Sequence, residues 1–111
     1  MEGLVFALKK AGFYLSKDNE RIKEFKNSRG RIAYMTTAQD IPGVVFHAMY
    51  EAKVRALATK SGHEADDGYY HNSNMRAYTT RRHGGDDDIH YGVKVQFRSV
   101  SQMTAVLEVL A

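Results

Sequence analysis

Histidines beside acidic residues are the side chains of this sequence that could do metal chemistry. His83 and His90 enclose the segment HGGDDDIH, and His63 opens HEADD. A metal ion needs three or four converging nitrogen or oxygen ligands, and these segments supply such atoms. Their spacings match no known metal motif, and solvated loop acids explain them more simply. We expect no metal and no other cofactor; metal-dependent hydrolysis by His83, Asp86 and His90 is the weakest of three functional hypotheses.

Nucleophilic catalysis lacks its usual residues. The sequence has no cysteine, no serine in a GxSxG elbow and no evident serine, histidine and acid arrangement. Its glycines form no phosphate cradle, since GGDDD would bring three carboxylates to an anion. His47, in the apolar run VVFHAM, and His90, at a strand start, are better explained as packed or hydrogen-bonded side chains than as catalysts. We expect a protein that is not an enzyme.

Basic residues interleaved with aromatic ones suggest nucleic-acid binding instead. They follow a predicted hairpin over residues 17–31 that carries Phe25, and recur near Tyr78. Basic strands that carry aromatic side chains can contact the nucleic-acid backbone and stack on bases. Acidic residues interrupt the first run, so a charged sheet edge that discourages aggregation is the preferred interpretation. The candidate nucleic-acid contacts are Lys26, Arg29, Arg31, Arg81 and Arg82.

Two adjacent tyrosines lie in the segment 61–74, SGHEADDGYYHNSN, which has no periodicity and many loop-forming residues. Loops of this length inside compact domains are often functional. Aromatic side chains are enriched as anchors of protein contacts, which makes Tyr69, Tyr70 and His71 candidates for protein binding. The tyrosines could equally fold back and cover the core, and the sequence leaves both alternatives open.

Hydrophobic periodicity predicts the elements that position these residues in the first half of the chain. Residues 2–11 have helical spacing and end at Gly12. Short strands should follow around Leu15 and in RIKEFK, with the turn NSRG at 27–30 joining the latter to RIAYMTT as a hairpin. The run 43–49 reads as a more buried strand, and 50–60 as a helix.

The second half should contribute two strands and a last helix. MRAYTT at 75–80 is typical of a strand, and RRHGGDDD at 81–88 of a turn-bearing connection. Residues 89–99 alternate so regularly that one face should lie in the core and the other in water. Ser99 and Gln102 form a capping box before an apolar stripe. The order of elements predicts an α+β fold of two layers, an antiparallel sheet with helices packed mainly on one face.

Composition limits the class of protein further. A chain of 111 residues with 43% hydrophobic content is expected to form one domain over 1–111. The absence of cysteine is compatible with the cytoplasm, our expected location. No apolar stretch approaches the roughly 20 residues of a membrane helix, so we expect no membrane association. The formal net charge of +3 permits weak attraction to nucleic acid.

Several short motifs in order resemble the YgaC family of small uncharacterised bacterial proteins, whose fold is related to the amino-terminal domain of the competence regulator TfoX. The matching segments are KAGF at 10–13, RG at 29–30, VFHAM at 45–49 with ALA at 56–58, and HYG at 90–92 before a leucine-ended helix. The resemblance implies a two-layer α+β fold with an antiparallel sheet. It implies no activity, because it brings no catalytic or binding residues that could be carried over.

The leading hypothesis is a small interaction or regulatory module that binds a protein partner, or itself as a homodimer, through the sheet edge and the 61–74 loop. Weak nucleic-acid binding through the basic hairpin is the alternative.

Overall fold

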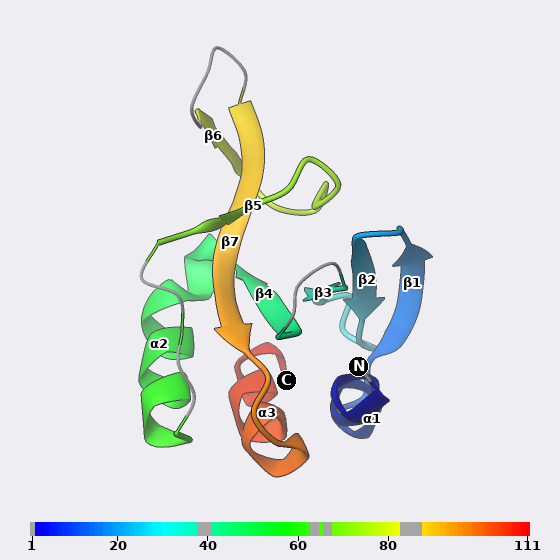
Figure 1. Ribbon diagram of the computed structural model, residues 1–111, viewed down its shortest axis with the longest axis vertical. Coiled ribbons are helices and arrows are strands. Elements are labelled where there is room, and N and C mark those ends of the chain that lie inside the picture. Colours follow the sequence, from blue (N-terminus) through cyan, green and yellow to red (C-terminus); the bar gives the residue numbers. More distant parts are fainter. Residues whose placement is uncertain (1, 38–40, 63–64, 66–67, 83–87) are drawn as a thin grey trace.

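The computed structural model describes residues 2–37, 41–62, 65, 68–82 and 88–111 (Figure 1). The three α-helices are α1 (Glu2–Lys10), α2 (Glu51–Lys60) and α3 (Val100–Leu107), with the short 3-10 helices η1 (Ala48–Tyr50) and η2 (Glu108–Leu110). The strands are β1 (Tyr14–Asp18), β2 (Ile22–Lys26), β3 (Ile32–Thr36), β4 (Gly43–His47), β5 (Tyr70–His71), β6 (Thr80–Arg82) and β7 (Asp88–Gln96).

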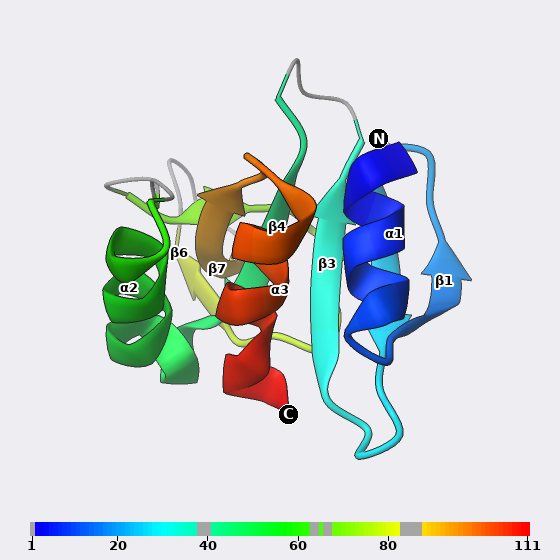
Figure 2. The ribbon, with the colours of Figure 1, turned by 90° about the horizontal axis from the view of Figure 1, so that it is seen from below.

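All described strand pairs are antiparallel, in the order β1-β2-β3-β4-β7-β5. The short β6 pairs with the first residues of β7, from Asp88 to His90. Helices α1, α2 and α3 lie side by side on one face of this sheet (Figure 2). The predicted α+β architecture, an antiparallel sheet with its helices on one face, is confirmed.

Local sequence signals account for the ends of the outer helices. Gly12 has a φ of 91°, and the amides of Gly12 and Phe13 donate to carbonyl oxygens of the last turn of α1, at 3.0 Å each. This is the left-handed stop expected from glycine after a helix. At α3 the Ser99 hydroxyl accepts from the Gln102 amide at 3.3 Å, so the predicted cap is confirmed. The hairpin predicted at 27–30 joins β2 and β3, and Gly30 supplies its positive φ of 78°.

The main core fills the space between the sheet and the helices. It includes Leu4 and Leu8 of α1, Phe46 of β4, Val95 of β7 and Met103 of α3, all fully buried. Val54 and Ala58 are the buried residues of α2. Burial of these apolar side chains is the main stabilising contribution expected in a domain of this size.

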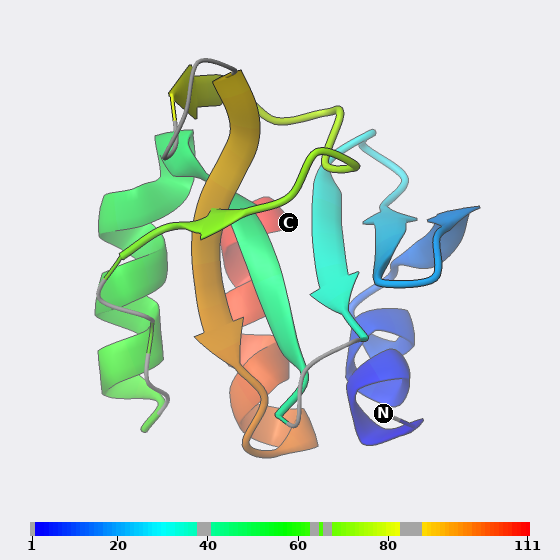
Figure 3. The same ribbon diagram turned by 45° about the horizontal axis from the view of Figure 1, so that its top comes forward.

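The opposite face of the sheet carries a second, smaller core, which the sequence did not predict. Its members are Ile22, Tyr34, Val45, Met75 and Tyr78. The segment after β5 crosses this face toward β3 and returns to β6 (Figure 3). Both faces of the central strands are therefore covered, one by helices and the other by an irregular segment.

The structure corrects several of the sequence predictions. The predicted strand 75–80 is a turn, in which the Tyr78 amide donates to the Met75 carbonyl at 3.0 Å, and only residues 80–82 form a strand. The predicted loop 61–74 contains β5 and a bridge from Ala65 to Val95. The predicted strand 43–49 ends at His47, because the chain turns into η1. Of the connection predicted over 81–88, residues 83–87 lie outside the described residues.

Two further corrections concern β7, and the first is the face that was expected to be in water. Lys94 on that face is only 4% exposed. Its ammonium lies 5.8 Å from the centroid of the Tyr70 ring, since β5 and the segment after it cover this part of the sheet. β7 also ends at Gln96, before the predicted limit of residue 99.

Candidate functional site

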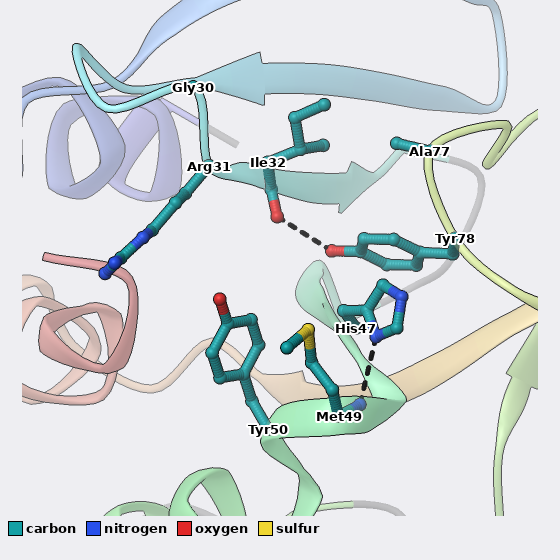
Figure 4. A pocket seen from close by; sticks show the side chains of 8 residues that line it. All are labelled: Gly30, Arg31, Ile32, His47, Met49, Tyr50, Ala77 and Tyr78. Atoms are coloured by element: carbon teal, nitrogen blue, oxygen red, sulfur yellow. Dashed lines mark hydrogen bonds between the residues drawn. The ribbon is translucent and has the colours of Figure 1, made fainter.

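A pocket of about 210 Å³ opens where the β2–β3 turn, the end of β4, η1 and residues 77–78 meet (Figure 4). Its lining residues are Gly30, Arg31, Ile32, His47, Met49, Tyr50, Ala77 and Tyr78. They come from three segments that are distant in sequence, 30–32, 47–50 and 77–78. The pairing of β3 with β4 and the fold of the 72–79 segment bring them together.

Tyr78 forms a rigid aromatic wall of the pocket. Its hydroxyl lies 2.7 Å from the Val45 carbonyl oxygen and 3.0 Å from that of Ile32, so the ring is tied to both β4 and β3. The ring also makes edge-to-face contacts with Tyr34 and His47, at centroid distances of 4.8 and 5.2 Å. Such pairs add to the stabilisation from burial and fix ring orientation.

His47 is a neutral member of the pocket. Its Nδ1 accepts a hydrogen bond from the Met49 amide at 3.0 Å, which assigns the ring proton to Nε2. Burial lowers the pKa of His47 below its usual value, because a charged imidazolium would lose hydration there. This supports the sequence-based interpretation of His47 as a packed, hydrogen-bonded residue.

Arg31 and Tyr50 supply the polar side of the pocket. The guanidinium of Arg31 and the hydroxyl of Tyr50 lie opposite the Tyr78 ring (Figure 4). Arg31 Nη1 donates to the carbonyl oxygen of Ala111. Within the described part of the chain, the Tyr50 hydroxyl has no hydrogen-bond partner. A guanidinium with further donors and a tyrosine hydroxyl can both donate to an anion.

The residues predicted for protein binding are built into the sheet rather than displayed by a loop. Tyr69 and Tyr70, adjacent in sequence, face opposite sides: Tyr69 packs against the main core and Tyr70 against the second one. The Tyr69 hydroxyl donates to Glu51 Oε1 at 2.7 Å. Of the two alternatives left open by the sequence, the structure has the tyrosines folded back onto the core.

Arg81, a predicted nucleic-acid contact, lies against two of the residues predicted for protein binding, Tyr69 and His71. Its guanidinium carbon lies 4.7 Å from the centroid of Tyr69 and 5.2 Å from that of Tyr91. Its Nε donates to His71 Nε2 at 2.9 Å, and His71 stacks on Tyr91 with centroids 6.0 Å apart. Cation–π and hydrogen-bond contacts of this kind stabilise the β5–β6–β7 region and occupy the Arg81 side chain.

The predicted nucleic-acid contacts are thus distributed over two places. Lys26, Arg29 and Arg31 belong to the β2–β3 hairpin, whereas Arg81 and Arg82 belong to β6. Arg29 and Arg82 are exposed and Lys26 is half-buried. Because Arg81 is engaged within the protein, its contacts favour a structural role for this arginine, whereas the guanidinium of Arg31 uses one donor for Ala111.

No family model, no curated protein and no solved structure matches this chain. The resemblance to the YgaC family therefore stays a prediction. Among the described residues, no three His, Cys, Asp or Glu side chains come together as a metal site. His83 and Asp86, of the metal hypothesis, lie outside that part. None of the described helices is long and apolar enough to span a bilayer.

A groove of about 390 Å³ between helix α1 and strands β2 and β3, called the α1–β2 groove, was missed by the sequence reasoning. It is lined by Glu2, Val5, Phe6, Lys9, Lys23 and Met35. Phe6 is 59% exposed although it is a large apolar residue. A signal was present in the sequence, because Phe6 falls outside the apolar stripe of the first helix and had no predicted partner.

The buried carboxylate of Glu24 is held by hydroxyl groups on the second-core face. Tyr34 donates to Glu24 Oε1 at 2.7 Å, and Ser16 donates to Oε2 at 2.8 Å. The Tyr34 hydroxyl also accepts from the Ala77 amide at 3.1 Å, which fixes the segment that lines the pocket. Burial raises the pKa of Tyr34 above its usual value, and the nearby Glu24 adds to this effect.

We expect the protein to lose stability in alkali because of Tyr34 and Tyr78. Burial also raises the pKa of Tyr78 well above its usual value. The pKa of each hydroxyl is raised above its unfolded value of about 10. The contribution of each to the free energy of unfolding is therefore complete below about pH 10 and is lost as pH rises above it. Each tyrosine is expected to contribute about 1.4 kcal/mol per pH unit to the slope of the free energy of unfolding against pH. Urea unfolding across this pH range should show a shallower slope for Tyr34→Phe than for the wild type.

Tyr14→Phe is the matched control for this experiment, because Tyr14 is 53% exposed on the edge strand. It should leave the alkaline slope unchanged. Equal slopes for the wild type and Tyr34→Phe would contradict the expected role of Tyr34.

Proposed function

We propose that the protein is a non-catalytic interaction module that binds a protein partner at the α1–β1 end of the sheet. The observation that carries the proposal is the exposure of Phe6 beside an apolar groove. A large apolar side chain in contact with water at a concave surface is typical of an interaction site. A cytoplasmic location is part of the proposal and has only the sequence as support.

The edge strand extends this surface. Leu15 of β1 is 44% exposed and pairs with Phe25 of the main core, so it lies on the same face of the sheet as the helices. β1 has β2 as its neighbour and stands at one end of the sheet order. Phe6 and Leu15 therefore give two exposed apolar anchors on one side of the molecule.

The charges around the groove are nearly balanced. Lys9, Lys23 and the acid Glu2 line it, and Lys23 forms an ion pair with Asp18 of β1. We therefore expect apolar side chains of the partner, rather than its charge, to supply most of the binding.

A partner protein is favoured over a second copy at this edge. A bulge between Leu15 and Lys17 interrupts the register of β1 with β2. Bulges and lysines on edge strands are devices that prevent strand-to-strand pairing between molecules. Docking of side chains into the groove does not need such pairing.

Photocrosslinking in cells tests the proposal. A photoreactive residue at position 15 should form an adduct with one protein in the native sequence, resistant to nuclease. Phe6→Asp should abolish the adduct, because it places a carboxylate on the apolar anchor. With the identified partner purified, Phe6→Asp should weaken binding at least about tenfold.

Met49→Asp is the matched control, since Met49 is 72% exposed at a different place. It should leave the adduct unchanged. An adduct that persists in Phe6→Asp would contradict the proposal. An adduct with a second copy of the chain would replace it with a homodimer, and a nuclease-sensitive adduct with nucleic-acid binding.

A further inference from the structure

We propose that the pocket beside Arg31 binds a small organic carboxylate with an aromatic or branched apolar body. This site is separate from the α1–β2 groove and does not depend on the function proposed there. It shares no lining residue with that groove.

The size of the pocket sets the size of the ligand. Its volume of about 210 Å³ corresponds to about seven water molecules at their volume in the liquid. This room suits a single ring with one substituent. The pocket is open to solvent beside the exposed Met49, so this volume describes the part of a ligand that it can hold.

The walls of the pocket define where an apolar body would lie. Ile32 and Tyr78 form one side, and Tyr78 is held in place by the carbonyl oxygens of Ile32 and Val45. His47 is neutral there, so this side carries no charge at neutral pH. Met49 is 72% exposed at the pocket, and its unbranched thioether side chain can adapt to a ligand of variable shape.

The opposite side defines where the carboxylate would lie. Arg31 and Tyr50 line the pocket on the side away from the Tyr78 ring, with the Arg31 guanidinium directed toward the end of the chain (Figure 4). Arg31 uses one donor for the carbonyl oxygen of Ala111, and a guanidinium has five. The remaining donors and the Tyr50 hydroxyl can pair with the two oxygens of a carboxylate, a charge-assisted arrangement that is stronger than a neutral one.

The position of Arg31 is set by the turn that precedes it. Asn27 Oδ1 accepts from the Arg31 amide at 2.9 Å and from the Arg29 amide at 3.1 Å. Gly30, with its positive φ, lets the chain turn so that residue 31 enters the pocket wall while residue 29 stays outside it. Of the two arginines of this turn, Arg31 lines the pocket and Arg29 does not.

Titration with sodium benzoate, followed by amide and methyl NMR, tests the proposal. Benzoate should cause saturable shifts at Gly30, Ile32, Met49 and Tyr78, with a Kd of roughly 1 mM or below. Benzamide, with the same ring but no charge, should bind at least about tenfold more weakly, because it cannot form the charge-assisted contacts. Acetate at equal ionic strength should give weaker binding, because it lacks the apolar body.

Two pairs of variants separate the pocket from general charge effects. Arg31→Gln should weaken benzoate binding at least about tenfold, whereas Arg29→Gln should leave it unchanged. Tyr50→Phe should weaken it severalfold, whereas Tyr14→Phe, an identical change on the exposed edge strand, should not. If Arg31→Gln fails to fold, because Arg31 also holds the chain end, the tyrosine pair still decides the question.

Several results would overturn the proposal. These are the absence of saturable shifts at the pocket, equal binding of benzoate and benzamide, and equal losses in the two members of a variant pair. Shifts centred on the α1–β2 groove would also overturn it. None of these outcomes bears on the photocrosslinking result, so the two proposals fail independently.

Discussion

Replacement of Gly92 by alanine is expected to lower the free energy of unfolding by more than about 3 kcal/mol. A Cβ atom at residue 92 would lie 2.4 Å from the Phe46 carbonyl oxygen and 2.8 Å from Val45 Cγ1. Gly92 pairs with His47 of β4 on one side and with Tyr70 of β5 on the other, so neither neighbour can move without loss of strand pairing. The free energy of unfolding of small domains is about 5–15 kcal/mol, so this loss is a large fraction of the total stability. Urea unfolding followed by circular dichroism measures the change.

Gly68→Ala is the matched control for Gly92→Ala. A Cβ atom at residue 68 meets no heavy atom within 4 Å. The free energy of unfolding should change by no more than about 0.5 kcal/mol. A Gly92→Ala protein as stable as Gly68→Ala would show that β4 and β7 are not packed as closely as described.

The second large effect is expected at Asn27, whose side chain joins the β2–β3 turn to the end of the chain. It is 7% exposed and makes three hydrogen bonds: Nδ2 donates to the Leu110 carbonyl at 2.7 Å, and Oδ1 accepts from the amides of Arg29 and Arg31. Asn27→Ala leaves these groups without their partner. We expect a loss of about 2–4 kcal/mol in the free energy of unfolding and faster hydrogen exchange at the Arg31 amide.

Asn72→Ala is the control, because Asn72 also accepts from a nearby turn amide, that of Asn74 at 2.9 Å, but in an exposed position. Its cost should be about 0.5–1 kcal/mol. Asn27→Asp should also lower the free energy of unfolding, by more than Asn72→Ala does, since it keeps the acceptor and loses the donor to Leu110. Equal costs at residues 27 and 72 would contradict the proposed linkage.

The helices and the first four strands could be predicted because each carries its own local signal. Gly12 after the lysines of α1, the NSRG turn and the Ser99 cap depend on contacts within a few residues of the chain. Such signals need no knowledge of the remainder of the fold. The predicted ends of β4 and β7 were less accurate, because tertiary contacts decide where a strand stops.

The second core could not be predicted, because it depends on two side chains in a segment without periodicity. Met75 and Tyr78 are buried in a turn and contact Tyr34 and Val45 on distant strands. Alternation in MRAYTT suggested a strand in their place. Lys94 is buried because the same segment covers its face of the sheet. The alternating sequence of β7 therefore predicted the strand correctly, but it predicted the wrong solvent exposure for this face.

The candidate site was only partly predictable for a similar reason. Arg31 and His47 were singled out from the sequence, each for its own chemistry, but nothing local indicated that Tyr50 and Tyr78 would join them. The arginines expected to act as one basic surface are divided between the hairpin and β6. Chemistry that several distant segments assemble becomes visible only with the strand order.

The place of β7 in the sheet has a consequence for biosynthesis. β7 lies between β4 and β5 although it is the last strand in the sequence. While the ribosome makes the chain from its amino terminus, β1 to β4 can pair in order, but β4 keeps one bare edge until residues 88–96 have emerged. Exposed strand edges promote association between chains, so this nascent stage is the one at which we expect the protein to depend most on chaperones.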